Sequence, residues 1–369
     1  MTYTDLNPPI RTLLGPGPTT AHPRVLRAMT TPLLGYLDPE FLAIMDEVQE
    51  LLRFVFQTEN KLTLAISGTG SAGMEASLCN FIEPGDHVVV GVNGFFGARI
   101  AEIAARYGAE VTTLEKPWGQ VFTPEEIETA LKANPTKILA LVHAETSTGA
   151  LQPMDGIGEI AQRQGALLLL DTVTSLSGVP LQIDNWGVDI AYSATQKCLS
   201  CPPGLAPITV SERARELMVQ RESKVANWYL DLSLLERYWD ENRQYHHTVS
   251  MSLIYALREG LRMVQEEGLQ ARHARHRTIA KMLWDGLEEL DFEMHVPLEH
   301  RLPTLTTLRL YPGLDDAGVR TRLLNDYNIE IAGGFGALAG QVWRIGLMGF
   351  SSRRENVTLL LAALRDILS

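Results

Sequence analysis

The chain has 369 residues, of which 45% are hydrophobic and 21% are charged. This composition excludes a disordered chain or an extended coiled coil, and at about 150 residues per domain the length predicts two or three domains. The formal net charge of −12 at pH 7 argues against nucleic acid as a partner, which would need clustered positive charge.

The chain begins with MTYTDLNPPIRTLL, which lacks the basic cap and apolar segment of a secretory signal. No apolar run approaches the roughly 18 residues of a membrane span. The three cysteines are an odd number, which favours a reducing compartment over a disulfide framework. Cys198 and Cys201 form a lone CxxC without the second pair that zinc needs. We therefore expect a cytoplasmic protein with no membrane partner and no metal.

Prolines and glycines between residues 8 and 18 predict an extended arm over residues 1–20. Pro39 then opens an amphipathic helix with apolar residues at helical spacing from 41 to 55. From residue 62 onward, short apolar strands alternate with helices. We expect strands at 62–66, 87–92, 110–114, 138–143, 166–170, 188–192 and 206–210. We expect helices at about 72–82, 97–107, from Pro124, and at 155–164.

Apolar strands separated by helices predict an α/β fold with a mostly parallel sheet covered on both faces. Ligands of such sheets bind at the carboxyl ends of the strands. The tract 211–250 looks irregular, and a long helical region follows. A smaller α+β section is expected to contain strands at 304–310, 329–332 and 342–346 and helices at 315–327 and 353–368. We place a large domain at 21–265 and a small C-terminal domain at 266–369.

A glycine-rich loop follows the strand 62–66 and precedes a helix. Its small residues let backbone N–H groups close around a phosphate, although a tight turn without ligand is an alternative. The loop also matches GxGxxG, the dinucleotide fingerprint over Gly68–Gly73. A dinucleotide site would need an acidic residue at the end of the next strand, and residues 92–94 contain none. The pattern favours a single phosphate group.

Three further strand ends carry polar residues. The loop 143–149 has a run of polar side chains, and Asp171 ends the strand 166–170. Asp171 either caps the next segment or binds a protonated ring nitrogen. Lys197 follows one strand–crossover–strand unit later, and is one of only seven lysines in the chain. A phosphate cradle, an acid and a lysine suit pyridoxal 5′-phosphate, which needs a Lys Schiff base and a carboxylate at its pyridinium nitrogen.

These residues resemble the class V pyridoxal-phosphate aminotransferases, most closely the alanine–glyoxylate / serine–pyruvate aminotransferase group. The resemblance runs along nearly the whole chain and includes the motifs LLGPGP (13–18), SGTGSAGMEA (67–76), ETSTGALQP (145–153), DTVTSL (171–176), YSATQK (192–197), YHHT (245–248) and WRIGLMG (343–349). YHHT together with RIGLMG is typical of this branch. The resemblance implies fold type I and a homodimer with shared active sites.

The resemblance also implies the role of each cofactor-binding residue. Lys197 would form the Schiff base and move the proton between the substrate Cα and the cofactor. Asp171 would bind the pyridine nitrogen. The remaining contacts would come from Val173 and Phe96 on the two ring faces, Thr146 near the ring hydroxyl, and Thr69, Gly70, Ser71 and Gln196 at the phosphate, with Tyr245 and Thr248 reaching the phosphate of the other subunit.

Arg344 is the candidate for substrate binding, because it is the single charge in an apolar strand. A buried arginine needs a carboxylate, either an internal Asp or Glu or that of a substrate. The resemblance favours the substrate, with the stretch around Gly17 closing over it. Tyr36 replaces a histidine common in relatives, and we assign it no role.

The predicted activity is ping-pong transamination, with L-alanine and glyoxylate giving pyruvate and glycine. Serine as donor to glyoxylate or pyruvate is the near alternative. Aminoethylphosphonate transamination would need an extra cationic pocket. Cysteine desulfurases carry histidines where Phe96 and Gln196 stand, and an NAD-binding oxidoreductase would rest on the GxGxxG match alone. The histidine pairs 246–247 and 273/276 lack metal-site spacing, so we expect surface or interface histidines there.

Overall fold

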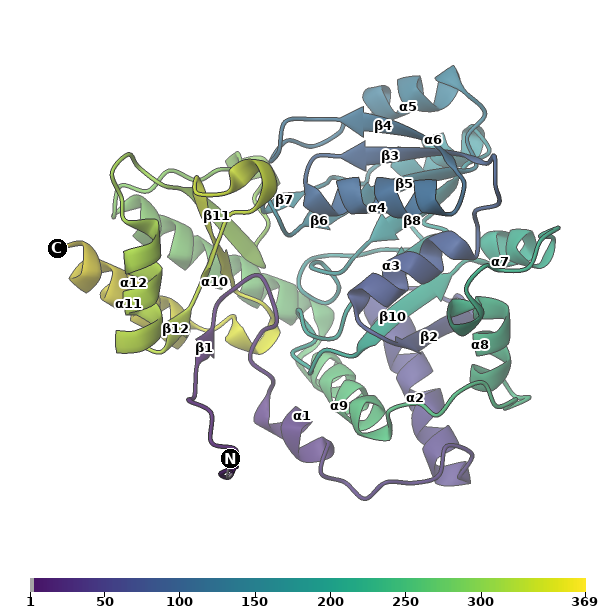
Figure 1. Cartoon of the computed structure of the whole chain (residues 1–369), viewed down its shortest axis with the longest axis horizontal. Helices are drawn as coiled ribbons and strands as arrows, with labels where there is room; N and C mark the ends of the chain where they lie inside the picture. The colour runs from purple at the N-terminus through teal and green to yellow at the C-terminus, as the bar shows by residue number, and fades with distance from the viewer. Residues whose placement is uncertain (1–2) are drawn as a thin grey trace.

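The computed structural model describes residues 3–369 and shows two packed parts, each with its own sheet (Figure 1). The larger sheet has seven strands in the order β2-β10-β9-β8-β5-β3-β4. They are β2 (Leu62–Ser67), β3 (His87–Val92), β4 (Glu110–Glu115), β5 (Ile138–Val142), β8 (Leu167–Asp171), β9 (Ile190–Tyr192) and β10 (Leu205–Val210). Only β10 runs antiparallel to its neighbours, so the mostly parallel α/β sheet is confirmed.

The central strands are buried because helices cover both faces of the sheet. All residues of β5 and β8 are buried, whereas the edge strand β4 is half-exposed and more polar. In the parallel register Val142 pairs with Asp171, and Asp171 pairs with Tyr192. This register brings the carboxyl ends of β5, β8 and β9 together.

The helices around this sheet begin at capping residues that the sequence supplies. Asp38 accepts a hydrogen bond from Glu40 N at the start of α2 (Pro39–Phe56), and Thr123 forms a capping box with Glu126 at the start of α5 (Pro124–Ala133). The others are α3 (Gly70–Cys79), α4 (Phe95–Arg106), α6 (Ile157–Arg163) and α9 (Met251–Glu267). Helix α2 packs against α9 below the sheet (Figure 1).

Three expectations about local structure were wrong or incomplete. The tract 211–250 contains α7 (Glu212–Val219) and α8 (Leu232–Trp239), which are capped by Ser211 and Asp231. Each spans about two turns, too short for a clear apolar period. The long helical region is two helices, because Gly268 with φ 78° separates α9 from α10 (Leu269–Glu288). The short helix α1 (Pro23–Ala28) was not predicted.

The smaller part is built on an antiparallel sheet in the order β11-β14-β13. Its elements are β11 (Leu305–Arg309), α11 (Asp316–Asp326), β12 (Ile329–Glu330), β13 (Ala332–Gly333), β14 (Val342–Gly346) and α12 (Arg354–Leu368). The arm contributes β1 (Thr12–Leu13), which pairs in parallel with β12. Leu14 joins the core of this part, so the arm is anchored there.

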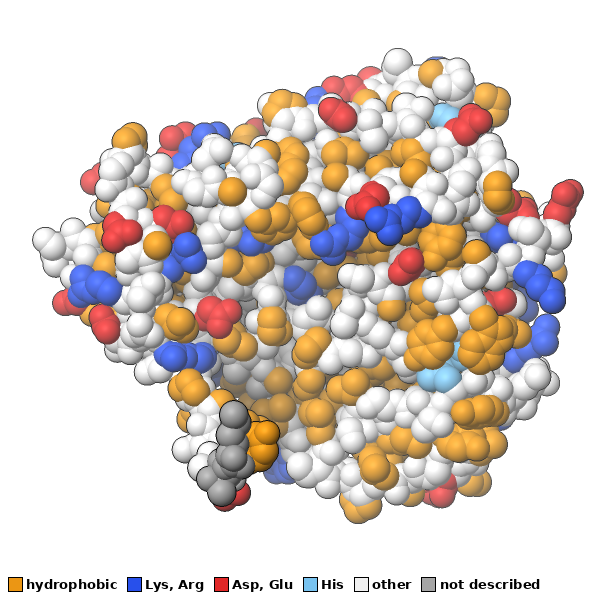
Figure 2. All heavy atoms as spheres, viewed as in Figure 1, with side chains coloured by type: hydrophobic (Ala, Val, Ile, Leu, Met, Phe, Trp, Pro, Cys, Tyr) orange, Lys and Arg blue, Asp and Glu red, His pale blue; other side chains and the backbone are white. Residues whose placement is uncertain are grey.

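Figure 2 shows that this face of the molecule is hollowed where the two parts meet, with basic side chains inside the hollow. Among residues 3–369, no helix is long and apolar enough to cross a membrane.

Candidate active site

The glycine-rich loop lies between β2 and the first turn of α3. Thr69 is the N-cap of α3, yet its hydroxyl makes no capping hydrogen bond. Thr69 and Ser71 are exposed, whereas Gly70 is buried. A Cβ on Gly70 would lie 2.9 Å from Cβ of Ala194, so the backbone here packs too closely for a side chain. The unpaired N–H groups of the helix start therefore fit an oxyanion such as a phosphate.

Lys197 lies in the loop after β9, with only 8% of its surface exposed. Its Nζ donates a hydrogen bond to the carbonyl oxygen of Pro16 in the N-terminal arm. A Cβ on Gly17 would lie 2.6 Å from the same Nζ, so the arm closes directly over this amine. Burial lowers the pKa of Lys197 from 10.5 to about 8. The amine can therefore gain or lose a proton near neutral pH, as a general base must.

Asp171 ends β8 and is buried, with 2% exposure. Its Oδ1 accepts from Val173 N at 2.8 Å, and its Oδ2 accepts from the Tyr192 hydroxyl at 2.6 Å. The first bond is the capping role that the sequence left open. Burial raises the pKa of this carboxyl to about 6, and no cationic side chain among residues 3–369 forms an ion pair with it. A protonated ring nitrogen would supply the missing charge.

We expect Asp171→Asn to stabilise the apoprotein at pH 7. The folded-state pKa of about 6 lies above the usual 3.8. The wild-type protein therefore loses free energy of unfolding as the pH rises from about 4 to about 6. Asparagine carries no charge, can accept from Val173 N with its Oδ1, and can donate from its Nδ2 to the Tyr192 hydroxyl oxygen. The variant should therefore gain on the order of 2 kcal/mol. Urea unfolding of both apoproteins at pH 7 and pH 4 measures this. A gain of the same size at both pH values would contradict the assignment.

Arg344 lies in the middle of β14, with 7% exposure. Its Nε donates to the Gly333 carbonyl at 3.0 Å and its Nη1 to the Thr146 carbonyl at 3.3 Å. The guanidinium lies 4.3 Å over the Phe335 ring. Within the described part of the chain, no Asp or Glu forms an ion pair with it, so the internal-partner alternative is not observed. This buried guanidinium is suited to a carboxylate ligand.

Glu145 is a fully buried carboxylate that sequence reasoning did not single out. Its Oε1 accepts from Ser147 N at 2.9 Å and from Ser147 Oγ at 2.6 Å, and its Oε2 accepts from Phe96 N at 3.1 Å. Burial raises its pKa, and these donors oppose that rise. Glu145 thereby fixes the start of α4, where Phe96 is half-buried. The sequence showed only an acid in a polar loop.

The other predicted residues fall into two groups. Thr146, Val173 and Gln196 belong to the strand-end loops around Lys197 and Asp171, and Gln196 has a buried Oε1 with no partner. Tyr245 and Thr248 are exposed and lie 3.4 Å apart between their oxygens. Their approach to the phosphate of a second subunit stays a prediction.

The family model for aminotransferase class-V matches residues 14–360. The chain belongs to the class V aminotransferases. A solved alanine–glyoxylate aminotransferase from Nostoc sp. is 55% identical, with a TM-score of 0.99 over 100% of this chain and 98% of that one. The (S)-ureidoglycine–glyoxylate transaminase of Bacillus subtilis is 43% identical over 99% of this chain and 92% of the relative. The alanine–glyoxylate aminotransferase of Callithrix jacchus is 43% identical over 98% of this chain and 89% of the relative.

Pyridoxal phosphate is therefore the cofactor of this aminotransferase, and the NAD-binding alternative is wrong. The residues fit it, because a phosphate cradle, an acid without a cationic partner and a buried lysine follow strands of one sheet. When bound, the cofactor supplies an electron sink for charge at the substrate α-carbon. Known cysteine desulfurases share the fold, as one from Thermococcus onnurineus shows at 15% identity.

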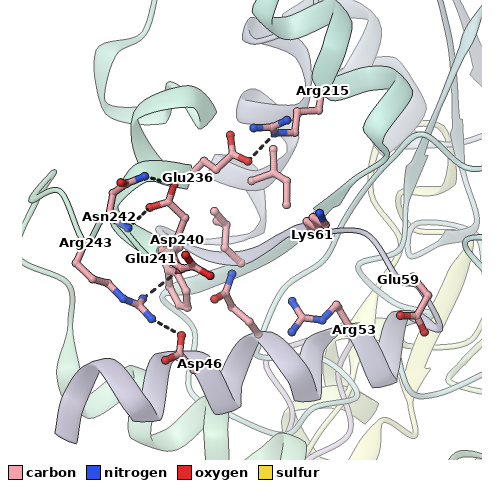
Figure 3. Close-up of a pocket in the computed structure, with 14 residues that line it drawn as sticks. Asp46, Arg53, Glu59, Lys61, Arg215, Glu236, Asp240, Glu241, Asn242 and Arg243 are labelled. Atoms are coloured by element: carbon pink, nitrogen blue, oxygen red, sulfur yellow. Dashed lines mark hydrogen bonds and ion pairs between the residues drawn. The ribbon is translucent and has the colours of Figure 1, made fainter. Parts of the chain in front are cut away.

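A hollow of about 680 Å³ lies elsewhere, between α2 and α8 (Figure 3). Ion pairs cross it, including Arg215 with Glu236 at 2.6 Å and Arg243 with Asp46. None of the strand-end residues described above lines it. This hollow is therefore separate from the candidate active site.

Proposed function

We propose that this class V aminotransferase transfers the amino group of L-alanine to glyoxylate, with pyruvate and glycine as products. The observation that supports the proposal is that the site has one buried arginine and a lysine whose amine is closely covered by the backbone of the N-terminal arm. Arg344 offers one carboxylate site, and the Pro16–Gly17 backbone leaves no room for a Cβ next to Lys197 Nζ. Such a site favours small monocarboxylic substrates.

Three residues and the N-terminal arm have separate roles in the reaction. Arg344 holds the α-carboxylate of both amino acid and oxo acid, so the two substrates bind in the same place in turn. Lys197 would take the proton from the α-carbon of the amino donor and move it to the cofactor, and would carry a proton in the opposite direction to the α-carbon of the oxo acid in the second half of the reaction. Asp171 keeps the ring nitrogen protonated, and the arm excludes water from the lysine. These roles agree with a ping-pong sequence.

(S)-Ureidoglycine as amino donor is a second candidate, because the Bacillus subtilis relative named for it matches 99% of this chain. Its ureido group carries several hydrogen-bonding atoms where alanine has a methyl group. A site built for that group must pair those atoms when they are buried. Serine is a third donor of small size.

Single-turnover reactions followed at the absorption band of the bound cofactor distinguish these donors. We expect L-alanine to react with a kcat/KM at least about tenfold above those of L-serine and (S)-ureidoglycine, equivalent to about 1.4 kcal/mol. Aminoethylphosphonate is the control, since it has no carboxylate for Arg344. Faster reaction with (S)-ureidoglycine than with L-alanine would show that (S)-ureidoglycine is the amino donor.

A further inference from the structure

The histidine pair of the YHHT motif lies against the phosphate loop of its own chain. His246 is only 6% exposed and His247 is half-buried, so of the two expected settings, surface or interface, the exposed surface is wrong for this pair. His247 Nε2 lies 2.7 Å from Oγ of Ser67. Ser67 is the last residue of β2, so this contact reaches the strand end from which the loop departs.

Ser67 is held from several sides. The Tyr229 hydroxyl donates to the Ser67 carbonyl oxygen at 3.2 Å, and the Tyr229 ring lies 5.1 Å from the His247 ring. On the sheet side, Gly68 N donates to the Gly204 carbonyl at 2.9 Å. The loop is thus fixed by Gly204, the residue before β10, on one side and by His247 and Tyr229 on the other.

The hydrogen bonds of the pair have one arrangement that satisfies every contact with neutral rings. His246 Nε2–H donates to the Trp228 carbonyl at 3.4 Å, and His247 Nδ1–H donates to His246 Nδ1 at 2.8 Å. His247 Nε2 is then an acceptor, and the Ser67 hydroxyl donates to it. The His246 ring also stacks on Trp228, with centroids 4.5 Å apart. Burial lowers the pKa of His247 to about 4, so the neutral form persists at pH 7.

We propose that His247 is a positioning residue for the cofactor phosphate. By accepting a hydrogen bond from the Ser67 hydroxyl, His247 fixes the start of the loop. It thereby also sets the directions of the N–H groups at Thr69, Gly70 and Ser71. Loss of this anchor lets the loop shift, and phosphate binding weakens. The inference rests on pyridoxal phosphate as cofactor and on this loop as its phosphate site, and it is independent of the amino donor.

The test compares two probes on the apoenzyme: pyridoxal phosphate and pyridoxal, which lacks the phosphate. Dissociation constants are measured by quenching of protein fluorescence for wild type, His247→Leu, Ser67→Ala and the double variant. We expect each single variant to weaken pyridoxal phosphate about tenfold and to leave pyridoxal unchanged. The double variant should lose no more than either single one, because both remove the same bond.

Two further variants complete the design. His247→Gln keeps a hydrogen-bonding group near Nε2 and should restore most of the affinity, and His273→Leu removes a half-buried histidine on α10 as the matched control. Equal losses for both probes, additive losses in the double variant, or a similar loss in His273→Leu would overturn the proposal. If His247→Leu does not fold, Ser67→Ala alone tests the proposal. The proposal is then overturned if Ser67→Ala has the same ratio of dissociation constants for pyridoxal phosphate and pyridoxal as the wild type. None of these outcomes depends on which amino acid the enzyme uses.

Discussion

Replacing Lys197 with alanine is expected to lower kcat for amino transfer by about 10⁴-fold, the upper end of the range for a side chain that transfers a proton. Lys197 is the only lysine among residues 3–369 that the structure buries, at 8% exposure. Its amine has a pKa of about 8 because of that burial, and no other amine of the candidate site can replace it.

Steady-state kinetics with L-alanine and glyoxylate measure this loss. Lys224→Ala is the matched control, since Lys224 is exposed and should leave kcat unchanged. Added methylamine should restore part of the lost rate, because a free amine can take over the proton transfer. Activity of Lys197→Ala within tenfold of wild type would refute the role.

Replacing Arg344 with glutamine is expected to raise KM for both the amino acid and the oxo acid and to lower kcat/KM by about 10²–10³-fold, because a buried charged pair is worth roughly 2–5 kcal/mol. The cofactor should stay bound, since Arg344 bonds to the Gly333 and Thr146 carbonyls and not to the phosphate loop. Arg344→Lys should recover only part of the loss, because an ammonium cannot make the two-pronged contact.

Kinetics with each substrate varied in turn test this effect, and cofactor content is read from absorbance. Arg309→Gln is the control, because Arg309 is an exposed arginine on the neighbouring strand β11. Unchanged KM values in Arg344→Gln would show that the carboxylate binds elsewhere.

The strand ends of the large sheet could be predicted from the sequence, because apolar runs mark buried parallel strands. That pattern located Asp171 at the end of β8 and Lys197 in the loop after β9. Arg344 was found in the same way, as one charge in an apolar run. The local sequence was sufficient to predict where in the fold these residues lie.

The supporting contacts could not be predicted, because they join distant parts of the chain. Ser67 and His247 are 180 residues apart, and the Phe335 ring under Arg344 comes from a loop with no distinctive pattern. Glu145 looked like any acid in a polar loop until its complete burial was seen. Helices α7 and α8 were missed because two-turn helices leave too few periodic positions.

We expect Lys197 to carry the cofactor as a Schiff base. Reduction of the holoenzyme with borohydride fixes the bound pyridoxal phosphate to its lysine, and peptide mass spectrometry then identifies that residue among the seven lysines of the chain. We predict a phosphopyridoxyl group on Lys197 in the peptide containing YSATQK. A group on any other lysine, or on none, would contradict the role of Lys197.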